Sequence, residues 1–137
     1  HIPGDMILFG HFASTTLFRL DTVIVFKEMV KIDPKRNTSQ YYKASIEPLK
    51  IKEGYFYKGY NYSENKYFSF VPCLVQPDLS SVPPMPGIDL TRYGFKIKKS
   101  WYGYVAASIP FSNKIWSQLI TDVTKVGWLL GTHIDKI

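Results

Sequence analysis

Basic and aromatic side chains gather in one interval of the chain that contains no acid. From Arg92 to Thr121 cations and aromatic rings occur together, and neither aspartate nor glutamate is present. Cations neutralise phosphates and aromatic faces accept stacked bases, so this composition is typical of a nucleic-acid or nucleotide surface. The residues that we expect to contact nucleic acid are Arg92, Lys96, Lys98, Lys99, Trp101, Tyr102, Tyr104 and Lys114.

The same interval has a second interpretation, which the sequence leaves open. Lysines on the solvent face of a strand, with aromatic rings in the core, produce the same one-dimensional pattern. The aromatic-rich stretch from Tyr41 to Phe70 is ambiguous in the same way, because tyrosines serve cores, protein interfaces and base-stacking cages alike.

Candidates for proton transfer are few and scattered. They are His11, His133, Asp5 and Asp21, and His133 shares one face of an extended strand with Asp135. No nucleophile accompanies them, and the common hydrolase and nucleotide-phosphate motifs are missing from the sequence. We therefore assign no catalytic residue and expect neither a metal nor a cofactor.

The single cysteine, Cys73, lies in an apolar run, where cysteine behaves as a small buried hydrophobe. One cysteine excludes an intrachain disulfide framework and favours a reducing compartment, so we expect a cytoplasmic protein. No apolar run approaches the roughly 20 residues that a membrane-spanning helix needs, and we expect no membrane partner.

Length and composition predict one folded domain. The chain has 137 residues, a net charge of +6, 45% apolar and 20% charged residues, which excludes the class of highly charged disordered polymers. We expect a single domain over residues 1–137, with a proline-rich loop at 77–87. The chain begins with His1 rather than Met, which is consistent with a segment of a longer protein. The oligomeric state is not predicted.

Apolar runs and breaker residues predict mostly strands. Residues 6–10 and 17–26 should pair antiparallel across the connecting loop 11–16, followed by an exposed turn at 33–37. Residues 40–48 fit either a strand or a short helix. Residues 41–70 suggest strands separated by turns, Pro72 suggests a strand edge, and 95–110 and 128–131 are further strand candidates.

Residues 113–126 are predicted to form an amphipathic helix. Its apolar positions recur on one face, with Ser112 as the N-cap and Gly127 just past the end. We expect Ile115, Trp116, Leu119, Ile120 and Val123 to be buried. Many strands with one strong helix favour an α+β fold or a small closed β-barrel with a packed helix.

Two stretches resemble known families. Residues 4–10 (GDMILFG), followed by residues 20–25 (LDTVIV), resemble the opening strands of the small PUA-like barrels, including the EVE and ASCH branches and the nucleotide-modification-associated domains. Residues 57–60 (YKGY) through 68–72 (FSFVP) are similar to uncharacterised bacterial proteins with the same opening. The resemblance covers about half the chain. It implies a mostly antiparallel β-barrel with one packed C-terminal helix, whose mouth binds nucleic acid.

Three functions follow from these observations. The first is a non-enzymatic nucleic-acid-binding module for DNA or RNA, which reads a modified or flipped base through an aromatic pocket with a basic rim. The second is a small enzyme acting on a nucleotide or nucleic acid. The third is a protein-interaction domain whose tyrosines form the interface. A positive concavity would favour the first, clustered His and Asp side chains the second, and a flat aromatic patch the third.

Overall fold

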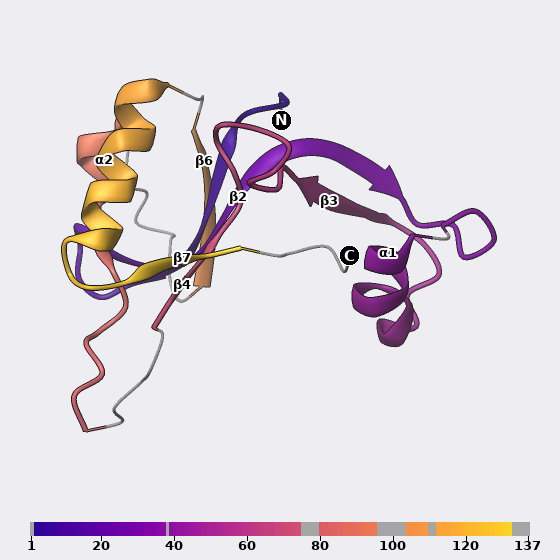
Figure 1. Ribbon diagram of the computed structural model, residues 1–137, viewed down its shortest axis with the longest axis horizontal. Helices are drawn as coiled ribbons and strands as arrows, with labels where there is room; N and C mark the ends of the chain where they lie inside the picture. The colour runs from indigo at the N-terminus through magenta and orange to yellow at the C-terminus, as the bar shows by residue number, and fades with distance from the viewer. Residues whose placement is uncertain (1, 38, 75–79, 96–103, 110–111, 133–137) are drawn as a thin grey trace.

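The computed structural model describes residues 2–37, 39–74, 80–95, 104–109 and 112–132 and shows an α+β fold with antiparallel strands (Figure 1). In the described residues the main sheet has the order β3-β2-β1-β6, β5 also pairs with β2, and β4 pairs with β7 in a separate ladder. The α+β class is confirmed, and in the described residues these ladders do not close into a barrel. The strands are β1 (Met6–Phe12), β2 (Leu17–Lys31), β3 (Tyr55–Gly59), β4 (Val71–Cys73), β5 (Gly87–Asp89), β6 (Tyr104–Ile109) and β7 (Leu129–Gly131).

The predicted first strand pair is confirmed, and both strands are longer than predicted. β1 and β2 run antiparallel, with Met6 opposite Val25 and Phe12 opposite Phe18. The register shifts between Phe9 and Gly10. A Cβ at Gly10 would lie 2.0 Å from the carbonyl oxygen of Arg19, so only glycine fits this bulge.

The first turn explains the Gly4-Asp5 pair. The Asp5 carboxylate accepts a hydrogen bond from the Ile2 amide at 3.0 Å, and the Asp5 amide donates to the Ile2 carbonyl at 2.9 Å. Gly4 has a φ of 96°, a conformation that favours glycine. Both residues shape the entry into β1.

β2 is the central strand because different partners occupy its two edges. β1 pairs along one edge, while β5, an isolated bridge between Val23 and Phe70, and β3 follow one another along the other edge. β2 has 15 residues and spans about 50 Å, so its second half leaves the main sheet with β3 as a two-stranded arm (Figure 1). We call residues 27–58 the arm.

The helix at the C-terminal end is confirmed as α2 (Asn113–Thr124). The Ser112 hydroxyl accepts a hydrogen bond from the Ile115 amide at 3.2 Å, and Gly127 has a φ of 89°. Leu119 and Val123 are fully buried against the sheet. Ile115, Trp116 and Ile120 were expected to be buried, but they are only half-buried. They pack against the edge of the core.

The core lies between α2 and one face of the sheet (Figure 1). Its buried members come from β1, β2, β5, the turn η2 (Leu90–Tyr93), α2, the residue before β4 and the segment before β7. They are Met6, Leu8, Phe18, Leu20, Val23, Val25, Phe70, Ile88, Leu90, Tyr93, Leu119, Val123 and Trp128.

The ambiguous segment at 40–48 is helical. It forms α1 (Gln40–Ser45), whose N-cap Ser39 accepts a hydrogen bond from the Tyr42 amide at 3.1 Å, and the 3-10 turn η1 (Glu47–Leu49). The turn predicted at 33–37 is present, and the Asp33 carbonyl accepts hydrogen bonds from the amides of Arg36 and Asn37. Cys73 is half-buried in β4 rather than buried as predicted. The proline-rich segment has no helix or strand from 80 to 86, and its residues 77–79 lie outside the described residues.

Candidate nucleic-acid interface

An open pocket of about 540 Å³ lies between η2 and the first turns of α2. Arg92 and Lys114, both predicted as phosphate contacts, line it from different segments of the chain. The remaining lining residues are Tyr93, Ser112, Ile115 and Gln118. The pocket therefore brings together the two cations of the predicted surface whose side chains the structure describes.

η2 is built so that Arg92 faces outward. The Asp89 carboxylate caps the turn by accepting a hydrogen bond from the Thr91 amide at 3.0 Å, and Gly94 ends the turn with a φ of 86°. Leu90 and Tyr93 are buried, which leaves the Arg92 side chain exposed. The hydrophobic anchoring of its neighbours thus fixes the backbone that carries this guanidinium.

A buried carboxylate holds two of the lining side chains in place. Asp122 is 3% exposed and accepts hydrogen bonds from the Tyr93 hydroxyl, from Gln118 Nε2 at 2.9 Å and from Lys125 Nζ at 3.2 Å. A carboxylate only accepts, so the amide nitrogen of Gln118 must face it. The carbonyl oxygen of Gln118 therefore does not take part in the bond to Asp122.

The pKa values in this network follow from burial and from these bonds. Burial raises the pKa of the Tyr93 hydroxyl well above its ordinary value, and the hydrogen bond to Asp122 raises it further. Burial alone would also raise the pKa of Asp122. The hydrogen bonds from Tyr93, Lys125 and Gln118 outweigh that effect, so the pKa of Asp122 lies below its ordinary value. At neutral pH the tyrosine is a neutral donor and the aspartate is charged.

The exposed charge around the pocket is positive. Arg92 and Lys114 are exposed, and within the described part of the chain neither forms an ion pair. Of the two acids near the pocket, Asp122 is buried and paired with Lys125, and the Asp89 carboxylate accepts hydrogen bonds from the Thr91 amide and hydroxyl. The first turn of α2 holds no acidic residue, so the helix dipole adds to the positive potential. The pocket is suited to an anion.

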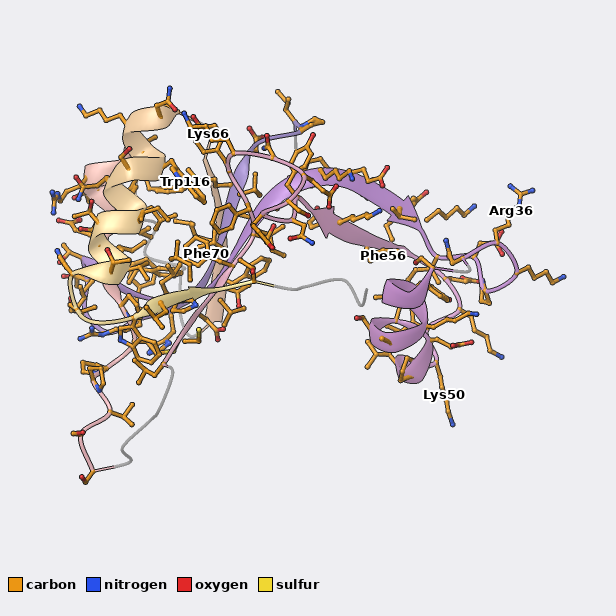
Figure 2. The ribbon with its side chains drawn as sticks, in the orientation of Figure 1. Arg36, Lys50, Phe56, Lys66, Phe70 and Trp116 are labelled. Carbon is orange, nitrogen blue, oxygen red and sulfur yellow. The ribbon has the colours of Figure 1, made fainter. Side chains whose placement is uncertain are left out.

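A further lysine stands beside the same end of α2. Lys66 Nζ lies 5.6 Å from the centre of the Tyr67 ring, whose hydroxyl donates to the Asn113 side chain. Trp116 lies between α2 and the sheet, with its ring edge-on to those of Tyr67 and Phe70 (Figure 2). Trp116 is thus a packing residue, as the second interpretation of the interval predicts.

The structure describes only part of the predicted surface. Lys96, Lys98, Lys99, Trp101 and Tyr102 lie outside the described residues, and their assignment stays a prediction. Tyr104 begins β6, opposite His11 of β1. Sequence reasoning missed Tyr93, Gln118 and Lys66. Gln118 could have been found, because it lies one helical turn after Lys114 on the same face.

The proton-transfer candidates are not gathered into one site in the described residues. Asp5 and His11 lie at opposite ends of β1, about 20 Å apart along an extended strand. The Asp21 carboxylate accepts a hydrogen bond from the Thr22 hydroxyl, and His133 and Asp135 lie outside the described residues. Among the residues that the structure describes, no group of three or more His, Cys, Asp or Glu side chains could hold a metal ion.

Comparison with known protein families, with curated proteins and with solved structures finds no match to this chain. Within the described ranges, no helix is both long enough and apolar enough to span a membrane.

Proposed function

We propose that the chain is a nucleic-acid-binding module and that the pocket between η2 and α2 receives a phosphate of the bound strand. One observation carries this proposal. Arg92 and Lys114 come from separate segments of the acid-free interval, yet both line one open pocket. Lysines spread over solvent-facing surfaces, as in the second interpretation of the interval, give no reason for such convergence.

The chemistry of the pocket agrees with a nucleotide unit. Its volume of about 540 Å³ falls in the usual range for ligand sites of about 300–1,000 Å³. Arg92 supplies a planar fork for phosphate oxygens, and Lys114 adds a second cation. The Gln118 carbonyl oxygen offers an acceptor and Ile115 an apolar wall. We assign base stacking to Trp101, Tyr102 or Tyr104, as the sequence predicts.

We also propose that the fold is of the PUA-like kind. The support is that residues 4–10 and 20–25, which carry the resemblance, lie in the β1–β2 pair at the centre of the sheet. The proposed reading of a modified or flipped base, in DNA or RNA, and the cytoplasmic location rest on that resemblance and on the composition.

A salt titration tests the proposal. Binding of an unstructured thymine oligonucleotide and of a duplex is measured against salt for the wild type and for Arg92→Glu/Lys114→Glu. Each lost phosphate contact lowers the slope of log K against log salt by about 0.7 for a single strand and about 0.9 for a duplex. We expect the double variant to bind more weakly, with a slope reduced accordingly. Trp101→Ala should weaken binding by about 1–3 kcal/mol without changing the slope, since stacking releases no counterion.

The matched control is Lys43→Glu/Lys50→Glu, which makes the same change in net charge on α1 and beside η1. Lys43 and Lys50 are exposed. Lys43 lies in α1, which Figure 1 shows away from α2, and Figure 2 shows Lys50 at the same end of the molecule. This control should keep the wild-type slope. The proposal is wrong if the wild type shows no binding at about 50 mM salt, or if the pocket variant and the control behave alike.

A further inference from the structure

The arm has one covered face and one open face. On the covered face Val30 lies opposite Phe56. The centre of the Phe56 ring lies 6.1 Å from that of Tyr42 in α1. Figure 2 shows Phe56 between the strands and α1. Tyr42 and Ile32 are buried there. Because side chains alternate along a strand, the neighbouring residues must point to the other face.

The open face carries two tyrosines. Tyr55 and Tyr57 are 61% and 39% exposed, and Met29, opposite Tyr57, is 54% exposed. Lys31 lies opposite Tyr55 and is also exposed. The two tyrosines are two positions apart in β3, with Phe56 between them, so their rings stand about 7 Å apart. That spacing lets two successive unstacked bases each take one ring, as on other sheet surfaces that bind single strands.

The charge around this face is positive. Residues 27–58 contain eight Lys or Arg and four Asp or Glu, and three of those cations, Lys27, Arg36 and Lys58, are held in ion pairs. Two of those acids are already paired inside the arm, Glu28 with Lys58 at 3.7 Å and Asp33 with Arg36 at 3.6 Å. Glu28, the acid in the arm half of β2, lies opposite Lys58 in the register and so points away from the tyrosines. Among the paired residues of β2 and β3, Lys31 is therefore the charged side chain that the register places beside the tyrosines, where it can attract a phosphate.

We propose that the open face of the arm, formed by Met29, Lys31, Tyr55 and Tyr57, binds a single-stranded segment of nucleic acid. Tyr55 and Tyr57 stack on two bases, and Lys31 contacts a phosphate. This inference rests on the proposed function and adds to it a second contact surface, outside the pocket. It also selects single strands, because the bases of a duplex are stacked on one another and offer no free face.

The test replaces the tyrosine rings in two ways. Tyr55→Leu/Tyr57→Leu keeps apolar side chains but removes the aromatic faces, whereas Tyr55→Phe/Tyr57→Phe keeps the faces and removes the hydroxyls. We expect the leucine variant, which loses two stacking rings, to bind the thymine oligonucleotide at least about 30-fold more weakly. Its salt slope and its affinity for a duplex should be those of the wild type, and the phenylalanine variant should bind as the wild type does.

A charge change on the same face adds an independent readout. Lys31→Glu should reduce the salt slope for the single strand by about 0.7, the value for one lost phosphate contact. The matched control Lys43→Glu, on the α1 side, should leave that slope unchanged. Tyr57 contacts Phe26, with ring centres 5.4 Å apart. If the double leucine variant does not fold, Tyr55→Leu alone carries the test.

The outcomes separate this inference from the proposed function. Absence of oligonucleotide binding by the wild type overturns both. Loss of binding in Arg92→Glu/Lys114→Glu, together with wild-type affinity in the leucine variant, overturns the arm alone. Equal weakening of single strand and duplex by the leucine variant also overturns it. So does wild-type affinity combined with a loss of self-association in that variant, which would assign the tyrosines to an interface between copies of this chain.

Discussion

Asp122 links stability to the pocket, because its carboxylate accepts from Tyr93 and Gln118, which line the pocket, and from Lys125. Its pKa lies below the ordinary value in the folded protein. In the unfolded chain the pKa of this carboxyl is near 4. The stability that Asp122 contributes is therefore complete above that pH, and it is lost as the pH falls through the lower pKa of the folded state. We expect Asp122→Asn to lower the free energy of unfolding by about 1–3 kcal/mol at neutral pH. Its stability should also depend less on pH below about 4.

Urea denaturation at a series of pH values measures this effect, with Glu53→Gln, an exposed carboxylate of the arm, as the control. The control should match the wild type at neutral pH. Equal acid sensitivity in Asp122→Asn and the wild type would contradict the assignment. The sequence could not predict the network, because Tyr93 lies 29 positions from Asp122 and only the fold brings them together.

At the scale of elements, α2 shows a clear contrast between a buried position and an exposed one. Leu119 is fully buried in the core, while Val126, just past the helix end, is 44% exposed. Leu119→Ala should lower the free energy of unfolding by about 2–5 kcal/mol through lost burial and the cavity left behind. Val126→Ala should change it by less than about 0.5 kcal/mol. Thermal or urea unfolding measures both, and equal losses would show that the apolar face is misplaced.

Local patterns explain which elements could be predicted. α2 and the β1–β2 pair follow from side-chain periodicity, from the Ser112 cap and from apolar runs, all of which act over a few residues. The extension of β2 beyond Phe26 could not be predicted in this way, because its polar residues face solvent and its partner β3 is distant in sequence. For the same reason the sequence indicated Arg92 and Lys114 as cations but not their shared pocket.

For the whole molecule, core and arm differ in how much they bury. β1 has four buried residues, whereas in β3 every residue is exposed or half-buried. Regions with few buried apolar contacts open at lower free energy than the core. We expect the amides of β3 to exchange with deuterium faster than those of β1 under native conditions. Hydrogen-exchange mass spectrometry measures this, and equal protection of the two strands would show that core and arm unfold together.

The continuity of β2 from core to arm also limits how the arm can change in length. Beyond the irregularity at Lys27, successive residues alternate between the α1 side and the tyrosine side. Removing or inserting one residue in each strand at the base of the arm would turn everything beyond it over, so that α1 and the tyrosines would exchange sides. A change of two residues per strand would restore the original orientation. In evolution or in protein engineering, the arm can therefore be lengthened or shortened by an even number of residues per strand without changing which way the tyrosines face. An odd number of residues per strand turns the tyrosines to the opposite side.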